Sequence, residues 1–328
     1  MLSKIVLPDP PFFDTRPLEK LCQERGIDLT IFRDPPIDAE QLQARIIDAD
    51  AIIVDVLSEY NQQSLARNKK LRYLVTASVG MNHIDLKYCR GRDIEVSNFA
   101  QYNSRAVAEM AFANLISLLR HVPFANLAVR SNLWLTDYFE GEELKGKKLG
   151  IVGAGNIGQE LVKIGQGFDM EILCNTKHPS TERAQALGIA KFCNLQEVLA
   201  QSDFVILAAT ATAETERIIN ESSLRLMQPH SYLINIARAN LVEPHALAKA
   251  LYEKRLAGAA LDFVGPEPYS LYQDALDIQE MVNRPNVIVT PHIGFNTKEA
   301  MARLASDVCD RVAAMLDNDK NFSIIEKF

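Results

Sequence analysis

The chain has 328 residues, a length that suggests about two domains. Hydrophobic residues make up 48% and charged residues 23%, as in ordinary globular proteins, and the net charge of -7 argues against nucleic acid or an anionic membrane as the main partner. No apolar run is long enough for a transmembrane helix, and the N-terminus lacks the pattern of a signal peptide. The five cysteines are scattered without a C-x-x-C pair, and the six histidines show no ligand spacing. We therefore expect a cytoplasmic protein with reduced thiols and no metal site.

The first hundred residues alternate short apolar runs with amphipathic segments. The apolar residues of segments 15–25 and 38–47 recur at helical spacing, which predicts two helices. Strands are predicted at residues 4–7, 29–32, 51–54 and 71–76. This alternation is typical of a parallel sheet wound with helices.

Segment 103–120 is predicted to be a long helix that is apolar around nearly its whole circumference, with Val107, Ala111, Leu115 and Leu118 among its residues. Such a helix has to be buried. Burial between domains, in a subunit interface or in the ordinary core of one domain would each satisfy this pattern.

The run from Leu149 to Gly158, LGIVGAGNIG, is the most informative stretch of the chain. A predicted strand breaks into a glycine-rich turn that opens a helix, which is the setting of the G-x-G-x-x-G dinucleotide-binding fingerprint. Gly153 permits the tight turn, Gly155 lets the backbone approach a pyrophosphate, and Gly158 lets the helix pack against its strand. The helix N-terminus offers N–H groups and the positive end of its dipole to the phosphates.

Polar side chains follow three of the later predicted strands. Arg238 follows one strand, Asp262 and then Glu267 follow the next, and His292 follows the last. Because the carboxyl ends of parallel strands face the ligand crevice, we expect these side chains to converge on one bound cofactor. The later strands are predicted at 171–174, 204–207, 232–236, 259–261 and 287–289, a long loop with a short helix at 266–286, and the last helix at 298–316.

These residue types suit the reduction of a carbonyl by hydride. The alkoxide that forms needs a proton, which His292 can supply because imidazole titrates near neutral pH. A carboxylate beside the imidazole, the role that Glu267 fits, would fix its tautomer and raise its pKa. The guanidinium of Arg238 can hold a substrate carboxylate in a bidentate grip and polarise the carbonyl.

The last helix suggests how the domains are arranged along the sequence. If this helix returns to cover the first sheet, the dinucleotide-binding domain is an insertion. We therefore predict an α/β protein of two wound domains. Residues 1–100 and 295–328 would form the first domain, and residues 101–294 the inserted dinucleotide-binding domain.

The chain resembles the D-isomer-specific 2-hydroxyacid dehydrogenase family over nearly its whole length, most densely over residues 77–294. The family's Arg–Glu–His catalytic set falls on Arg238, Glu267 and His292. Its V-G-x-x-x-I-D segment falls on residues 79–85, which implies that backbone N–H groups of Val79, Gly80 and Met81 bind the substrate carboxylate. The resemblance also implies two Rossmann-like, doubly wound domains, of which the one made of residues 1–100 and 295–328 is a flavodoxin-like substrate domain. It implies a homodimer as well, with helix 103–120 where family members dimerise.

The resemblance and the fingerprint together give a set of expected cofactor contacts. Val107 belongs to the N-x-x-x-V-A-E stretch that lines the family's cofactor crevice, and Asp262 matches the carboxylate that faces the nicotinamide end. The loop after strand 204–207 touches the cofactor through its backbone in the family. The full expected set is Val107, Gly153, Gly155, Asn156, Ile157, Gly158, Asn175, Thr176, Lys177, Ala209, Thr210, Ala237 and Asp262.

Two departures from the family pattern bear on these expectations. The family commonly has Arg-Gly where this chain has Arg238-Ala239, a change that is tolerated unless the glycine needs a positive φ. NAD-specific members end the second strand of the nucleotide domain with Asp or Glu, where this chain has Asn175. No carboxylate there repels a 2′-phosphate, and Lys177 can pair with one. Both NADP and NAD are possible cofactors, and NADP is favoured.

The sequence therefore predicts an oxidoreductase that transfers a hydride between NAD(P)H and a 2-keto acid or D-2-hydroxy acid. Two alternatives share the fold: a formate dehydrogenase-like enzyme and a dinucleotide-sensing corepressor. Glu267 argues against the first, because formate dehydrogenases pair their histidine with glutamine. Between Ala51 and Ala66 there is no Lys or Arg, so a phosphorylated substrate is not expected.

Overall fold

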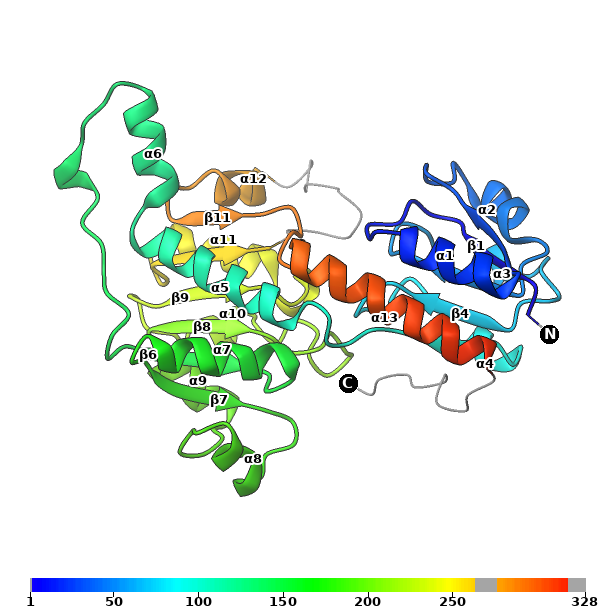
Figure 1. Cartoon of the computed structure of the whole chain (residues 1–328). Coiled ribbons are helices and arrows are strands. Elements are labelled where there is room, and N and C mark those ends of the chain that lie inside the picture. Colours follow the sequence, from blue (N-terminus) through cyan, green and yellow to red (C-terminus); the bar gives the residue numbers. More distant parts are fainter. Residues whose placement is uncertain (1, 263–275, 318–328) are drawn as a thin grey trace. The chain divides into compact units, whose positions relative to one another are not determined.

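The structure is a computed structural model, and it describes residues 2–262 and 276–317. The chain splits into two compact units: unit 1 comprises Met1–Asn103 and Asn296–Phe328, and unit 2 comprises Ser104–Phe295 (Figure 1). Unit 2 is thus inserted in the sequence of unit 1. Each unit holds a parallel sheet with helices, which confirms the predicted α/β fold class.

Unit 1 contains a five-stranded parallel sheet in the order β2-β1-β3-β4-β5. The strands are β1 (Lys4–Leu7), β2 (Asp28–Ile31), β3 (Ala51–Val54), β4 (Tyr73–Thr76) and β5 (Glu95–Ser97). The first four agree with the predicted strands to within two residues at either end, whereas the three-residue β5 was not predicted. The helices are α1 (Arg16–Arg25), α2 (Ala39–Ile46), α3 (Gln62–Leu65), α4 (Leu86–Gly91) and α13 (Lys298–Leu316).

The last helix, α13, belongs to unit 1. It packs against α1, and Arg25 of α1 pairs with Asp317 at its C-terminal end at 2.9 Å. On the same helix, Arg303 donates to the Tyr102 carbonyl at 2.8 Å. The apolar face of α13, which includes Leu304, Val308 and Val312, is buried.

Unit 2 contains a six-stranded sheet in the order β11-β10-β9-β8-β6-β7, and every pairing in it is parallel. The strands are β6 (Lys148–Val152), β7 (Glu171–Asn175), β8 (Phe204–Leu207), β9 (Tyr232–Asn235), β10 (Gly258–Leu261) and β11 (Val287–Val289). The sequence order reverses between β6 and β8, so the carboxyl ends of these two strands flank a topological switch point, where doubly wound sheets bind ligands.

Helices cover both faces of this sheet. Successive residues of a strand point to opposite faces, so each face carries apolar side chains that a helix layer buries. Ile151 and Ile206 lie in the core under α5 and α7, whereas Val152 and Val205 lie in the core under α9 and α11. The helices of unit 2 are α5 (Ser104–Leu119), α6 (Val122–Arg130), η1 (Thr136–Tyr138), α7 (Asn156–Gly167), α8 (Thr181–Ala186), α9 (Leu195–Gln201), α10 (Glu221–Leu224), η2 (Ala239–Leu241), α11 (Pro244–Tyr252) and α12 (Leu276–Val282).

The structure answers where the predicted apolar helix 103–120 is buried. Helix α5 packs against α7, β9 and β10 of its own unit, and its apolar residues are part of the core there. Helix α6, which follows it, has no buried residue and exposes Val122, Leu127 and Val129. In the described residues, no single helix is long and apolar enough to cross a membrane, although α5 and α6 pass that test together as a pair bent by 59°.

Candidate functional site

The glycine-rich turn joins β6 to α7. Gly153 has φ of +110°, and a Cβ there would lie 2.7 Å from the backbone of Ala208 and Ala209, so only glycine fits. A Cβ on Gly158 would lie 2.0 Å from the Gly153 carbonyl oxygen. A Cβ on Gly155 would meet nothing within 4 Å, so that side of the turn is open to a ligand.

The N-terminus of α7 is available to an anion. Gly155 is its N-cap residue, and no side chain caps the helix. Asn156 is exposed, and Ile157 is half-buried. The first N–H groups of a helix need acceptors from outside the helix, and a phosphate meets that need. The turn and the helix together therefore fit the pyrophosphate of a dinucleotide.

Beside this turn, the end of β7 carries polar and cationic groups. Asn175 donates from Nδ2 to the Cys193 carbonyl at 3.0 Å. Lys177 lies two residues on, next to the half-buried Thr176, and pairs with Glu214 at 2.6 Å. Arg183 of α8 donates to the Ala154 carbonyl, within the glycine-rich turn, at 3.0 Å. The sequence analysis placed one cation, Lys177, after β7, and the structure adds a second, Arg183.

The loop after β8 lies against the same turn. The Ala208 N–H donates to the Val152 carbonyl at 2.8 Å, and the backbone of Ala208 and Ala209 lies close to Gly153. Ala209 is half-buried and Thr210 is exposed. The Thr210 carbonyl accepts the hydroxyl of Thr215 at 2.7 Å, which fixes the shape of this loop.

The turn after β9 carries Arg238. The buried side chain of Asn235 accepts the Ala237 N–H at 3.0 Å and donates to the Arg238 carbonyl at 2.7 Å. The half-buried Arg238 is thus held at the sheet edge by a residue that the sequence did not single out. Ala239 begins the 3₁₀ helix η2, so the alanine in place of the family's glycine needs no positive φ.

Asp262 follows β10 and holds the loop that carries His292. Asp262 is 2% exposed. It accepts the Thr290 hydroxyl at 2.6 Å, the Ile293 N–H at 3.1 Å and the Gly294 N–H at 2.8 Å. His292 has φ of +51°, and its N–H donates to the Asp262 carbonyl at 2.5 Å. Its ring lies edge-on to Phe295, with the centroids 5.7 Å apart.

Glu267 lies outside the described residues. Val107 is 6% exposed and its side chain belongs to the core of unit 2 beneath α5. Its role as a cofactor contact stays a prediction.

The expected substrate loop lies in unit 1, at the carboxyl end of β4. Its carbonyls are engaged: Ser78 donates to Gly80 O at 2.7 Å, Asn98 to Val79 O at 2.9 Å, and the Ile84 N–H to Met81 O at 3.0 Å. Within the described residues, no acceptor lies against the N–H groups of Val79, Gly80 and Met81. Successive free N–H groups of this kind form a concave anion site.

A buried aspartate supports this substrate loop. Asp9, which follows β1, accepts the hydroxyls of Ser58 and Tyr60, both of which follow β3. Tyr60 pairs with Ile84 in an isolated parallel bridge, and its ring lies edge-on to buried His83. Asp9 therefore ties the loops after β1, β3 and β4 together.

Comparisons with known proteins identify the family of the chain. Residues 112–294 match the profile of the D-isomer specific 2-hydroxyacid dehydrogenase, NAD binding domain. The chain belongs to the D-isomer-specific 2-hydroxyacid dehydrogenase family. It is 39% identical over 280 residues to a glyoxylate reductase of Pyrococcus furiosus. The aligned region covers 82% of this chain and 81% of that protein.

Solved structures extend the likeness to both units. An acyclic imino acid reductase in complex with NADPH and D-Arg has a TM-score of 0.85 and 28% identity, over 96% of this chain and 98% of that one. The D-lactate dehydrogenase of Aquifex aeolicus, complexed with NAD and lactic acid, has a TM-score of 0.84 and 27% identity, over 98% and 97%. The chain is thus an NAD(P)-dependent D-2-hydroxyacid dehydrogenase with two Rossmann-like domains, and the corepressor and formate dehydrogenase alternatives are not favoured.

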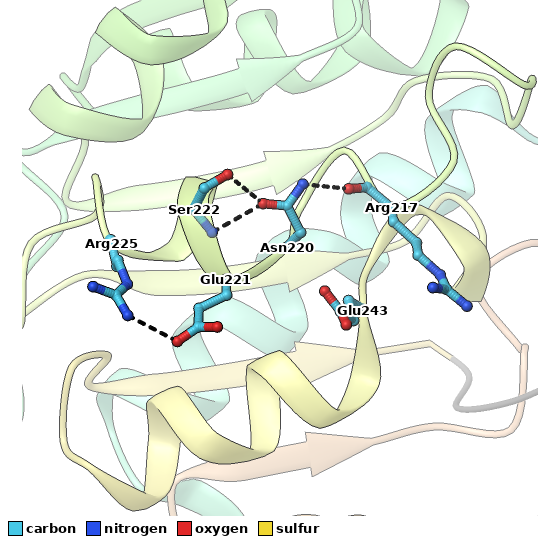
Figure 2. Close-up of a pocket in the computed structure, with 6 residues that line it drawn as sticks. All are labelled: Arg217, Asn220, Glu221, Ser222, Arg225 and Glu243. Atoms are coloured by element: carbon cyan, nitrogen blue, oxygen red, sulfur yellow. Dashed lines mark hydrogen bonds and ion pairs between the residues drawn. The ribbon is translucent and has the colours of Figure 1, made fainter.

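An open hollow of about 660 Å³ on unit 2 of this dehydrogenase contains none of the expected site residues (Figure 2). Its polar groups largely satisfy one another. Asn220 caps α10, and Glu221 pairs with Arg225 at 2.9 Å and with Lys249 at 3.2 Å. The hollow is lined by Arg217, Asn220, Glu221, Ser222, Arg225 and Glu243.

The sequence missed three side chains that shape the dehydrogenase site. Asn235 and Thr290 bind backbone or carboxylate groups near Arg238 and His292, and Arg183 reaches the glycine-rich turn from α8. Asn235 and Thr290 each stand at or just after the end of a strand, as Arg238 and His292 do, so the same pattern could have found them. Arg183 lies on a helix eight residues beyond β7, and only the tertiary structure brings it to the turn.

Proposed function

We propose that the chain reduces small, unphosphorylated 2-keto acids, glyoxylate among them, and that it prefers NADPH to NADH. One observation carries the proposal: His292 is fixed in a left-handed backbone conformation at the same sheet edge as an open glycine-rich turn. Strained residues at ligand-binding edges are typical of functional sites. The glyoxylate reductase relative supports the substrate class.

The roles of the chain's groups follow from their chemistry. When bound, the reduced nicotinamide supplies the hydride. Arg238 grips the substrate carboxylate and polarises the carbonyl. The N–H groups of Val79, Gly80 and Met81 keep the role that the family resemblance implies, as donors to the substrate carboxylate. The imidazole of His292 gives its proton to the carbonyl oxygen. Glu267, outside the described residues, keeps its sequence-based role of orienting that imidazole.

Two features support a preference for NADPH, and a third opposes it. The end of β7 carries Asn175 rather than a carboxylate that would bind the ribose hydroxyls and repel a 2′-phosphate. Lys177 and Arg183 add two cations beside it. Lys177 is paired with exposed Glu214, so a 2′-phosphate would compete with that carboxylate for the ammonium group.

The first test is oxidation of NADPH and NADH by the purified protein with glyoxylate, hydroxypyruvate, pyruvate and bulkier 2-keto acids. Turnover with glyoxylate and a higher kcat/KM for NADPH would support the proposal. Turnover only with phosphorylated keto acids would contradict the substrate class. Cofactor binding without turnover of any keto acid would favour the dinucleotide-sensing alternative.

The proposal includes a homodimer, which the family resemblance implies. The exposed apolar residues of α6, Val122, Leu127 and Val129, are the surface that we assign to the second copy, because α5 is already buried within unit 2. Light scattering after size exclusion should give twice the mass of the 36.6 kDa chain. Leu127→Glu should shift the protein toward monomer, and a monomeric wild type would contradict the dimer.

A cytoplasmic location is also part of the proposal. The five cysteines are all free, as expected for a reducing compartment. Fractionation of the source cells, with detection by antibody, tests this.

A further inference from the structure

The loop that carries His292 is strained at one residue. His292 has φ of +51°, in the left-handed region, which is unfavourable for a residue that carries a side chain. The neighbouring structure has to hold such a residue in place. The groups that do so determine where the imidazole points.

The holding groups converge on one side chain. The carboxylate of Asp262 accepts three hydrogen bonds, and all three donors belong to residues within two positions of His292: the Thr290 hydroxyl and the N–H groups of Ile293 and Gly294. Thr290 and Ile293 share Oδ1, whereas Gly294 alone uses Oδ2. Both carboxylate oxygens are therefore engaged within unit 2.

The backbone of the same two segments adds to this hold. The His292 N–H donates to the Asp262 carbonyl at 2.5 Å, and the Thr290 N–H donates to the Leu261 carbonyl at 2.9 Å. Gly294 allows the close approach, because a Cβ there would lie 2.8 Å from Asp262 Oδ2. The strands that lead into these segments, β10 and β11, pair in parallel up to Leu261 and Val289. The loop is thus held on a rigid support.

We propose that Asp262, with Thr290, is a positioning residue for catalysis: its buried carboxylate clamps residues 290–294 so that the strained His292 presents its imidazole for proton transfer. This inference rests on the proposed function, in which His292 is the proton donor. It gives the carboxylate a second role besides the cofactor contact expected from the sequence.

Substitution at Asp262 tests the clamp because asparagine has nearly the same shape. Its amide offers one acceptor oxygen and one donor nitrogen. With the nitrogen at the Oδ2 site, that donor faces the Gly294 N–H; in the flipped orientation it faces the Ile293 N–H. In either orientation one backbone N–H loses its acceptor, so the loop loosens.

Thr290 gives a second, milder test that keeps the carboxylate. Thr290→Val removes the hydroxyl that donates to Asp262, and Thr290→Ser keeps it. Asp203→Asn is the matched control, because Asp203 accepts the Lys148 N–H at 2.7 Å but precedes β8 at the opposite, amino edge of the same sheet.

Each variant is tested for the mobility of the loop and for catalysis. Hydrogen exchange of a peptide that covers residues 287–297, in the protein without cofactor, measures the first. Steady-state kinetics measures the second, and NADPH affinity is measured separately. We expect Asp262→Asn to exchange faster in that peptide and to lose about 100-fold in kcat, the effect of a displacement of about 1 Å. Thr290→Val should lose about ten-fold in kcat, which in activation free energy is half of the effect of Asp262→Asn. In Thr290→Val, NADPH affinity should stay within about two-fold of wild type, because Thr290 is not an expected cofactor contact. Thr290→Ser and Asp203→Asn should resemble wild type.

Other results would overturn the inference. Unchanged exchange in both Asp262→Asn and Thr290→Val would show that the carboxylate does not hold the loop. Unchanged exchange with a large loss of NADPH affinity would make Asp262 a cofactor contact only. If the wild type reduces no 2-keto acid, the proposed function fails, and the exchange measurement still decides whether the clamp exists. If Asp262→Asn does not fold, the Thr290 pair gives the answer.

Discussion

The two parallel sheets of this chain each place a buried aspartate just after a strand, but the two aspartates are held in different ways. Asp262 in unit 2 binds donors from one short loop, two of them backbone N–H groups. Asp9 in unit 1 binds the hydroxyls of Ser58 and Tyr60, which tie three loops together. The arrangement around Asp262 fixes the conformation of His292. The arrangement around Asp9 fixes the positions of the loops that follow β1, β3 and β4.

The acidic surroundings differ as well. Asp9 has a second buried acid, Asp55, as its neighbour after β3. Burial raises the pKa of Asp9, against the lowering effect of the Ser58 and Tyr60 hydroxyls. Burial also raises the pKa of Asp55 to about 7, and the charge of Asp9 adds to the rise. We therefore expect unit 2 substitutions to change the chemical step, and unit 1 substitutions to change substrate binding, stability and its pH dependence.

The largest expected effect is at His292. His292→Ala should lower kcat by about 1,000-fold, because a positioned general acid contributes about 100- to 10,000-fold. NADPH affinity, measured by fluorescence titration, should stay nearly unchanged. His178→Ala, at an exposed histidine after β7, tests whether any histidine loss has this effect. Loss of cofactor binding in His292→Ala would contradict the role of proton donor.

Arg238→Lys should come next. One ammonium group cannot copy the two parallel hydrogen bonds of a guanidinium to a carboxylate, so kcat/KM for the keto acid should fall by about 100-fold. Steady-state kinetics at saturating NADPH measures this. Arg225→Lys, at an arginine that pairs with Glu221 on the surface, is the control. Intact activity in Arg238→Lys would mean that Arg238 does not bind substrate.

Tyr60→Phe tests the unit 1 network by removing a single hydroxyl. The buried Asp9 carboxyl loses a donor, which should lower the free energy of unfolding by about 1 to 3 kcal/mol. The loop at residues 79–81 should loosen, so KM for the keto acid should rise more than kcat falls. Urea denaturation and steady-state kinetics check the two effects. A fall in kcat alone would remove the distinction drawn between the two units.

The pH dependence of stability gives a subtler test. Asp55 binds its proton more tightly in the folded state than in the unfolded state, where an ordinary aspartate has a pKa of about 4. Its stabilising contribution is therefore complete below about pH 4 and is lost as the pH rises toward about 7. Asp55→Asn should weaken this dependence and raise the Tm at pH 8 by a few degrees. Thermal unfolding across this pH range measures it, and a Tm at pH 8 that falls in Asp55→Asn would contradict the burial argument.

The smallest expected effect concerns Glu214. Glu214→Gln removes the carboxylate that holds Lys177 and lowers the competition for a 2′-phosphate. Affinity for NADPH should rise about two-fold while affinity for NADH stays unchanged, since exposed ion pairs contribute little. Glu24→Gln, which removes the exposed partner of Lys20 in α1, is the control. Equal changes for both cofactors would mean that Lys177 does not face the 2′-phosphate.

The sequence by itself determined the fold class, the family and the strands that carry the site. Apolar runs, the glycine spacing and the polar residues after strands are local signals, since each depends on side chains close together in the sequence. The same signals located Arg238, Asp262 and His292 at strand ends. Short elements with little periodicity, such as β5 and α10, gave no such signal.

Only the tertiary structure decided how these residues are held. The contacts of Asp262 with the loop at 290–294 and of Asp9 with Tyr60 join residues that are far apart in the sequence, and no spacing rule predicts them. The same holds for the burial of α5 inside unit 2 and for the approach of Arg183 to the glycine-rich turn. Strand ends can be predicted because backbone pairing follows local pattern, whereas the partner of a buried polar group depends on which loops the sheet order brings together.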